Sequence, residues 1–234
     1  DNFAWSDRNG DGLVQPEEVT WSKTIFRGDR YAPGKQPEFL VGWGHGCDPE
    51  LNLVLSGICK VEGGDDNALF RLAPTGWTDA GVPLFDVTRA TPFATARGAN
   101  GLYADVHGNV FVAGAEDSKA DALTCFDHNG KRLWRIAGKE KPRAKDVVAS
   151  NVIGELEIPG IGPVVGTWAW HGNYRPYLVS GDGLYIGTLL DDTKLGPASL
   201  WDESWRFYYQ APDGTPYLIN GANDAQHILK ITGL

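Results

Sequence analysis

The residues best suited to chemistry lie in one short loop near the start of the 234-residue chain. Within residues 7–18, oxygen-bearing groups recur at alternate positions and again at the twelfth, and Gly12 occupies the sixth. The set comprises Asp7, Asn9, Asp11, the backbone carbonyl of Leu13, Gln15 and Glu18. Calcium is a hard cation that takes about six to eight oxygen ligands, and a twelve-residue loop with this spacing supplies them. The sequence therefore predicts a calcium site in which Glu18 binds through both oxygens; a polar turn with chance acids is the alternative.

This spacing resembles the calcium loop of the EF-hand family, and the resemblance covers the loop alone. Pro16 stands where a short exit helix would begin, a position that tolerates Pro, and we expect that helix to continue through residues 19–27. Val14 is expected to point inward. Too few residues precede Asp7 for an entering helix, and the sequence contains no second loop. The resemblance therefore implies an isolated, structural calcium loop of the type found in secreted proteins, and not a calmodulin-like switch.

The composition favours a folded chain that does not bind nucleic acid. Hydrophobic residues make up 42% and charged residues 22% of the chain, so a packed core is expected. The 30 Gly and 14 Pro suit many short strands and turns. A net charge of −9 opposes binding to phosphate backbones. No apolar run approaches the ~20 residues of a membrane span.

The chain contains no Met and begins with Asp. We therefore expect a processed form or a piece of a longer chain, of which the remainder could carry a secretion signal. Extracellular calcium saturates even weak loops, so an extracellular or periplasmic location is expected. Cys47 and Cys59 could form a disulfide there; three unpaired core cysteines are the alternative. Cys125 lies in an apolar run and is expected to be a buried free thiol.

Beyond residue 39, short apolar runs separated by turn signals predict a β-rich body with an internal repeat of strand, turn and strand. The copies are residues 53–57 with 68–72 and the turn 74–76, residues 110–114 with 122–126 and the turn 128–130, residues 217–221 with 228–231, and a weaker copy at 184–187. Matching turns at residues 106–109 and 212–215 precede two copies. Each unit corresponds to one blade of a β-propeller, and a β-sandwich with similar hairpins is the alternative.

The units at residues 106–114 and 122–130 resemble the repeats of bacterial NHL and gluconolactonase-like β-propellers. The resemblance covers roughly residues 50–234 and accommodates about four to five blades, whereas closed propellers of this type have about six or seven. It implies an all-β fold class, with a partial or irregular propeller over residues 28–234. A short helical EF-hand-like calcium loop over residues 1–27 precedes it. The propeller is expected to be one continuous domain and a fragment of a longer chain.

A second group of residues suits ligand binding, because it combines aromatic rings with polar and charged groups. Its members are Trp168, Trp170, His171, Tyr174 and Arg175. Such a platform could hold a sugar or an anionic group, whereas aromatic filling between blades is the alternative. The catalytic candidates are His45, in a Gly-rich aromatic loop, together with His171 and Arg175. His107 and His128 lie in predicted turns and are expected to be exposed.

The sequence contains no serine nucleophile elbow, phosphate loop or dinucleotide fingerprint. We therefore expect a secreted calcium-binding propeller module that binds a glycan or a protein partner. The alternative is a carbohydrate-active enzyme: a polysaccharide lyase, a glycosidase or a sugar lactonase. That alternative predicts that His45 or His171 converges with an Arg or Tyr and a carboxylate. The acid pairs at residues 65–66 and 191–192 could serve acid–base chemistry or could be solvated loop residues.

Overall fold

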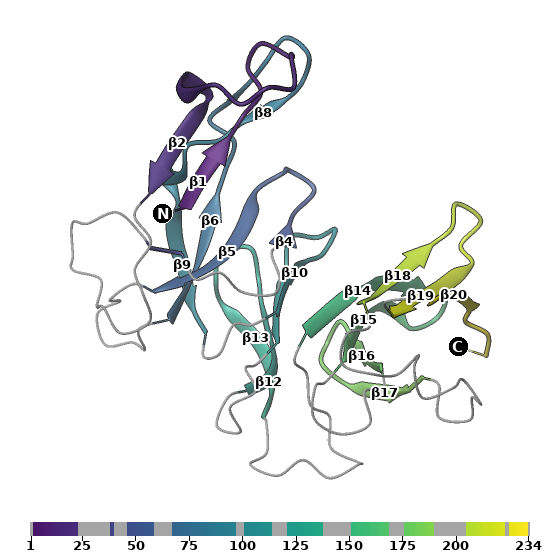
Figure 1. Ribbon diagram of the computed structural model, residues 1–234. Helices are drawn as coiled ribbons and strands as arrows, with labels where there is room; N and C mark the ends of the chain where they lie inside the picture. Colours follow the sequence, from purple (N-terminus) through teal and green to yellow (C-terminus); the bar gives the residue numbers. More distant parts are fainter. Residues whose placement is uncertain are drawn as a thin grey trace. The chain divides into compact units, whose positions relative to one another are not determined.

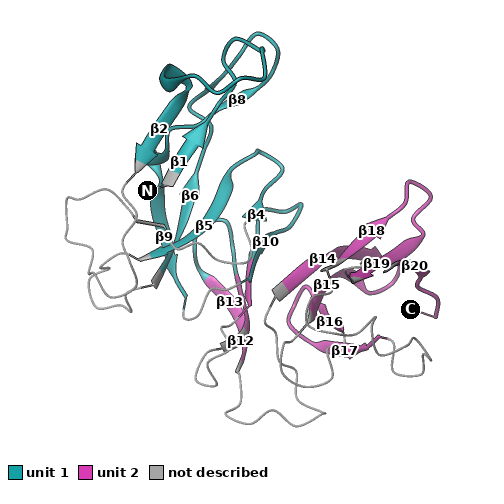
Figure 2. Cartoon of the chain, viewed as in Figure 1, with its two compact units in different colours: residues 1–110, 126–131 teal, residues 111–125, 132–234 magenta. Residues whose placement is uncertain are grey.

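The structure is a computed structural model, and it describes residues 2–22, 38–39, 46–58, 67–96, 101–113, 121–137, 151–168, 176–189, 205–222 and 225–233. These residues form several small antiparallel sheets, none of them closed, with two short 3-10 helices (Figure 1). The chain divides into two compact units, residues 1–110 with 126–131 and residues 111–125 with 132–234 (Figure 2). The predicted all-β class is therefore confirmed.

The first unit contains the calcium-loop hairpin and the earliest predicted repeat. Its elements are β1 (Asn2–Trp5), η1 (Pro16–Glu18), β2 (Val19–Ser22), β3 (Glu38–Phe39), β4 (Gly46–Cys47), β5 (Leu53–Ile58), β6 (Asn67–Leu72), β7 (Gly76–Trp77), β8 (Pro83–Leu84), η2 (Val87–Arg89), β9 (Thr91–Thr95) and β10 (Gly101–Ala104). Strands β3, β5, β6 and β9 form one sheet in that order, and β4 also pairs with β5. Its buried cluster comprises Ala68, Phe70, Leu72, Val87 and Ala90.

The second unit contains most of the later repeats. The remaining elements of the chain are β11 (Val110–Ala113), β12 (Asp121–Phe126), β13 (Arg132–Ala137), β14 (Asn151–Ile158), β15 (Gly162–Trp168), β16 (Tyr177–Ser180), β17 (Tyr185–Thr188), β18 (Trp205–Gln210), β19 (Pro216–Ala222) and β20 (Ala225–Lys230). The sheet orders are β10-β11-β12-β13, β14-β15-β16-β17 and β18-β19-β20, so strands adjacent in sequence are adjacent in each sheet. The predicted repeat strands are confirmed. A buried cluster joins β14–β16 to Tyr208 and Leu218 of the last sheet.

One five-residue turn recurs between paired strands, at residues 48–52, 78–82, 105–109, 127–131, 180–184 and 211–215. In each copy the first N–H donates to the fifth carbonyl, and the fourth N–H donates to the first carbonyl. The fourth residue has a positive φ, as in a hairpin loop that ends in a left-handed residue. It is Leu51 in the first copy and glycine in the other five. The predicted turns at residues 106–109, 128–130 and 212–215 are therefore confirmed.

Two of these turn glycines lie against an aromatic strand residue. In the first unit, a Cβ on Gly130 would overlap the backbone of Phe93 in β9. In the second unit, a Cβ on Gly183 would lie 2.7 Å from the ring of Trp134 in β13, and the Trp134 indole N–H donates to the Gly181 carbonyl (2.8 Å). Phe93 and Trp134 both lie on the last strand of their sheets. Each unit therefore uses the same contact, in which a sheet's last strand packs on a glycine turn.

The β1–β2 hairpin is attached to the first unit by small side chains. Ala4 packs against the buried cluster of that unit. The Ser6 hydroxyl accepts a hydrogen bond from the Phe85 N–H (3.0 Å), and the Thr20 hydroxyl accepts one from the Val87 N–H (3.2 Å). Because Val87 belongs to the buried cluster, the position of the hairpin is coupled to the core.

The helix predicted after the calcium loop is wrong. Only Pro16–Glu18 forms a 3-10 turn, and residues 19–22 form β2, which pairs with β1; residues 23–27 lie outside the described part. Val19, Thr20 and Trp21 favour a strand, and pairing with β1 stabilises it. The loop is therefore flanked by strands and not by EF-hand helices. Val14 is 65% exposed, contrary to the expectation that it points inward, since no described element packs over it.

The aromatic contact at Gly183 predicts a position-specific sensitivity to added side chains. Gly183 and Gly214 occupy the same turn position with φ of +89° and +82°, but a Cβ on Gly214 meets nothing within 4 Å. We expect Gly214→Ala to lower the free energy of unfolding by about 1 kcal/mol through backbone strain alone. Gly183→Ala should lower it further because the Trp134 ring must move. Equal losses in urea unfolding experiments would contradict this contact.

Candidate functional site

The predicted calcium loop connects β1 to β2 in the first unit (Figure 1). The Ser6 N–H donates to the Glu18 carbonyl (3.1 Å), which closes the base of the loop. The Glu18 N–H donates to the Gln15 carbonyl (3.1 Å), so η1 turns the chain back toward that base. Strand pairing on both sides therefore fixes the two ends of residues 7–18.

Glu18 is the one predicted ligand that is buried, at 4% exposed. Its Oε2 accepts from the Trp5 indole N–H (3.1 Å), and its Oε1 accepts from the N–H groups of Arg8 (2.7 Å) and Asn9 (3.3 Å). Burial raises the pKa of the Glu18 carboxyl, but the bonds from Trp5, Arg8 and Asn9 outweigh it, so the pKa lies below its usual value. The Glu18 carboxylate therefore ties the start of the loop to its end.

The other acids and Asn9 accept backbone hydrogen bonds within the loop. Asp7 accepts from the N–H groups of Gly10 (2.7 Å) and Gly12 (3.0 Å), and Asn9 Oδ1 accepts from the Asp11 N–H (3.0 Å). Asp11 Oδ1 accepts from the N–H of the residue two positions on (2.7 Å), and this bond is the main reason why the pKa of Asp11 is lowered. Both oxygens of Asp7 and Oδ1 of Asp11 keep a spare lone pair for a cation. Asp11 Oδ2 already accepts from Asn9 Nδ2 (3.0 Å) and Gln15 Nε2 (2.7 Å).

Among the buried side-chain nitrogen and oxygen atoms of the loop, one atom of Gln15 lacks a hydrogen-bond partner in the described part of the chain. Its Nε2 donates to Asp11 Oδ2 (2.7 Å), whereas its Oε1 is buried and has no hydrogen-bond partner. A buried polar atom without a partner costs free energy. The ligand types at all six predicted positions suit calcium, and the unpaired Gln15 Oε1 can accept a hydrogen bond or coordinate a cation.

The carboxylates of Asp7, Asp11 and Glu18 do not converge on a single point. Within the described ranges, no three His, Cys, Asp or Glu side chains are grouped closely enough to hold a metal ion. Asp7, Asp11 and Glu18 instead point to separate sets of N–H donors. Mutual repulsion of three carboxylates accounts for this spread. A calcium ion would have to draw them together, so the loop fits calcium in donor chemistry but is not closed around one.

The predicted ligand-binding group lies almost wholly outside the described residues. Trp168 ends β15, where it pairs with Asn151 across the sheet. The positions of Trp170, His171, Tyr174 and Arg175 are outside the described part, as are those of His45, the acid pairs and Cys59. The aromatic face and the catalytic candidates therefore remain predictions.

Other predicted residues can be placed. His107 and His128 are exposed in turns, as predicted. Cys125 is a fully buried thiol, as predicted. Cys47 is an exposed free thiol; burial raises its pKa, and the neighbouring Asp48 charge adds to the effect.

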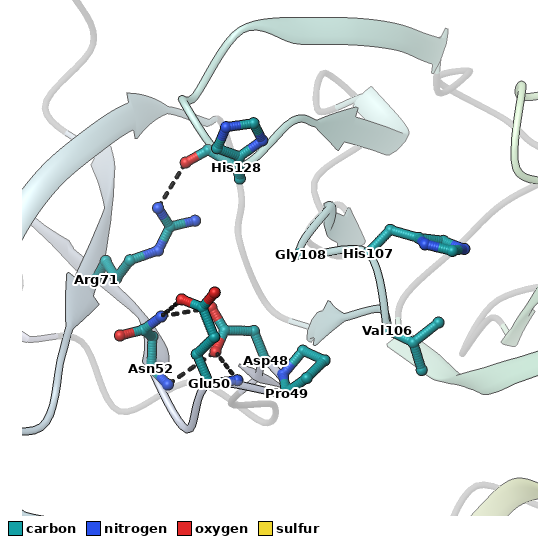
Figure 3. Close-up of a pocket in the computed structure, with 9 residues that line it drawn as sticks. All are labelled: Asp48, Pro49, Glu50, Asn52, Arg71, Val106, His107, Gly108 and His128. Carbon is teal, nitrogen blue, oxygen red and sulfur yellow. Dashed lines mark hydrogen bonds between the residues drawn. The ribbon is translucent and has the colours of Figure 1, made fainter.

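Sequence reasoning did not identify a cavity of about 230 Å³ in the first unit. Figure 3 shows Arg71, Glu50, Asp48, His107 and His128 around it. They come from β6 and from three of the recurring turns, so residues far apart in sequence meet at one end of their sheets. The available signal was Arg71 itself, a charged residue between buried Phe70 and Leu72.

Comparison of the chain with protein families finds no match, and no curated protein is similar to it in sequence. In the part of the chain that the structure describes, no helix is long and apolar enough to cross a membrane.

The hydrogen-bonded carboxylates predict an acid transition. The pKa of Asp127 lies below its ordinary 3.8, chiefly because its carboxylate accepts from the Lys131 N–H, and the pKa values of Asp11 and Glu18 are also lowered. A lowered folded-state pKa contributes stability that is complete above the ordinary value and is lost as pH falls through the folded value. The melting temperature should therefore stay level from pH 7 to about 5 and fall below about pH 4.

Asp127→Asn should reduce the acid dependence, because the amide keeps an acceptor oxygen but does not titrate. Asp79→Asn is the matched control, since the exposed Asp79 accepts no hydrogen bond within the described residues. Differential scanning calorimetry from pH 7 to 3 checks this. The same slope in both variants would contradict a role for the Asp127 carboxylate.

Proposed function

We propose that this chain is a secreted calcium-binding β-propeller module, in which residues 7–18 hold one calcium ion and the later sheets serve as blades. The buried, unpaired Gln15 Oε1 carries the calcium proposal. It lies at one of six ligand positions of a loop in which every other position also offers an oxygen. Calcium would give Gln15 Oε1 a partner and would offset the repulsion among Asp7, Asp11 and Glu18.

The role of the ion in this proposal is structural. Glu18 already links the two ends of the loop through Arg8 and Asn9, and Ser6 at its base accepts a bond from the Phe85 N–H. An ion shared by Asp7 and Glu18 would strengthen the same closure. Calcium binding would therefore stabilise the β1–β2 hairpin and, through its attachment, the core of the first unit.

The propeller assignment draws support from sheet order and packing. The sheets at β10–β13 and β14–β17 each have four strands in sequence order, as blades do. The repeated contacts of Phe93 with Gly130 and of Trp134 with Gly183 would be contacts between successive blades. The cluster that joins β14–β16 to Tyr208 is a further sheet-on-sheet contact in the second unit.

In this proposal the module binds a glycan or a protein partner, with Trp168, Trp170, His171, Tyr174 and Arg175 as its binding face. Aromatic rings stack on sugars, and arginine binds carboxylate or sulfate through two hydrogen bonds. An extracellular or periplasmic location agrees with a loop that is open to solvent around Leu13 and Val14, both 65% exposed.

A carbohydrate-active enzyme, either a polysaccharide lyase, a glycosidase or a sugar lactonase, is the second candidate function. The observation that favours it is the cavity at Arg71, which brings a guanidinium, histidines and the Glu50 carboxylate to one space. Such groups suit acid–base chemistry.

Calcium should raise the thermal stability of the chain. At 100 to 1,000 times the dissociation constant, one ion that binds only the folded state stabilises by about 3–4 kcal/mol. Glu18→Gln should abolish most of the difference between melting temperatures in calcium and in chelator. The adjacent, exposed Glu17 forms no hydrogen bond within the described residues, so Glu17→Gln is the matched control and should retain the difference.

Identical melting curves of the wild-type chain in calcium and in chelator would sink the calcium proposal. Magnesium at the same concentration gives a second control, because its smaller, octahedral shell suits this loop poorly. An equal increase with magnesium would indicate general cation screening and would also count against a calcium site.

A further inference from the structure

The guanidinium of Arg71 donates a hydrogen bond from Nη1, whereas its Nε and Nη2 donate none within the described residues. Its Nη1 donates to the His128 carbonyl (2.5 Å), and its Cζ lies 4.7 Å from the centroid of the Phe93 ring (Figure 3 shows the hydrogen bond). Its Nε and Nη2 are buried and have no hydrogen-bond partner. These two contacts fix the plane of the guanidinium and leave its Nε–Nη2 edge without an acceptor.

The geometry of the unpaired Nε–H and Nη2–H groups indicates which type of ligand they could bind. Nε–H and Nη2–H lie on the same edge of the guanidinium and point in parallel, so the two oxygens of one carboxylate can accept from both. A hydroxyl or an amide oxygen satisfies only one of them. Buried donors of a charged group are costly to leave unpaired, and native structures rarely keep them so without an ion or ligand.

The opposite wall of the cavity is anionic and offers acceptors. Asp48 is engaged mainly by its own turn, since its carboxylate accepts from the N–H groups of Glu50 and Asn52 and from Asn52 Nδ2. Glu50 is exposed, and within the described residues its carboxylate accepts one long bond, from Asn52 Nδ2 (3.3 Å). Figure 3 shows the Glu50 carboxylate across the cavity from Arg71. Glu50 therefore has oxygen acceptors to spare and a side chain that is able to move.

The turn that carries Glu50 is held in an unusual shape. Leu51 has a φ of +61° and is the one non-glycine residue with positive φ in the described ranges. The equivalent position is glycine in the other five recurring turns. The bonds from Glu50 and Asn52 to Asp48 keep this strained turn closed. Residues held in such conformations often occur at binding sites.

We propose that this cavity binds a small monocarboxylate that carries hydroxyl groups. Its carboxylate accepts from the Nε–Nη2 edge of Arg71, and its hydroxyls donate to Glu50. His107, which lines the same cavity, offers a further polar contact. Because Nε and Nη2 are buried in the structure, binding requires the side chains around them to shift.

Charge selects this class over other anions. A phosphate dianion would bring two negative charges next to Glu50, whereas a monocarboxylate brings one and pairs it with Arg71. A neutral sugar lacks the acceptor pair that the guanidinium edge requires. A carboxylate ligand that lacks hydroxyl groups offers the Glu50 carboxylate no hydrogen-bond donor. The ligand therefore needs both groups, at opposite ends of a molecule that fits about 230 Å³.

Isothermal titration calorimetry with glucuronate as the probe tests this proposal. Glucose, acetate and inorganic phosphate test the carboxylate, the hydroxyls and the charge separately. We expect glucuronate to bind at least about tenfold more tightly than any of the three. No heat with glucuronate, or tighter binding of phosphate, would overturn the proposal.

Two variants locate the binding. Arg71→Gln should weaken glucuronate binding at least about tenfold, while Arg132→Gln, an exposed arginine of β13, should leave it unchanged. Glu50→Gln, at an exposed position that does not endanger folding, should strengthen phosphate binding about tenfold by removing the repulsion. Unchanged glucuronate binding in Arg71→Gln, or unchanged phosphate binding in Glu50→Gln, would contradict the assigned roles.

This inference is independent of the calcium proposal. The titrations are run in saturating calcium, and melting in calcium against chelator is recorded on the same samples. Failure of calcium to stabilise the chain would overturn the proposed function and leave the Arg71 site standing. Failure of glucuronate to bind would overturn the Arg71 site alone.

Discussion

The structure depends on carboxylate side chains that accept hydrogen bonds from backbone N–H groups in tight turns. Asp48, Asp105 and Asp127 each open a recurring turn, and one oxygen of each accepts from the second and fourth following N–H groups. Charge-assisted bonds of this kind are stronger than neutral ones. They occupy donors that strand pairing cannot reach, and they hold the chain at the reversals on which sheet order depends.

The loop at residues 7–18 uses the same interaction over a longer span. Asp7 and Asp11 accept N–H groups ahead of them in the chain, and Glu18 accepts N–H groups behind it. Three carboxylates in twelve residues is a dense concentration of charge, and the N–H donors compensate it only in part. In the proposed site a cation at the centre would complete the compensation and would give the unpaired Gln15 Oε1 a partner. The proposed calcium site is thus an extension of the chemistry that holds the turns.

Local patterns made the strands and turns predictable from the sequence. Continuous apolar runs such as residues 110–114 predict strands, and the glycine within residues 127–131 predicts a turn, because both preferences depend on a few neighbouring residues. The segment after the loop was predicted to be helical because Pro16 and the acids after it resemble a helix start. It forms strand β2 instead, because it pairs with residues 2–5. The Arg71 cavity was not predictable, since it requires turns more than fifty residues apart to meet.

The two faces of the last sheet, β18-β19-β20, differ in their exposure to solvent. Its Tyr208 and Leu218 face is buried in the second unit, whereas Phe207, Tyr209 and Ile228 on its opposite face are 50%, 50% and 71% exposed. Phe207, Ile219 and Ile228 are cross-strand neighbours, so this apolar surface is continuous across all three strands. This face of the last sheet is therefore apolar and exposed to solvent.

The central claim, that residues 7–18 close around calcium, is tested most directly by a crystal structure grown in calcium with anomalous data. The account predicts one anomalous peak inside the loop, with Gln15 Oε1, the Leu13 carbonyl and the carboxylates of Asp7, Asp11 and Glu18 within about 2.3–2.6 Å. A loop that keeps its present hydrogen bonds and an unpaired Gln15 Oε1, with no peak at saturating calcium, would contradict it.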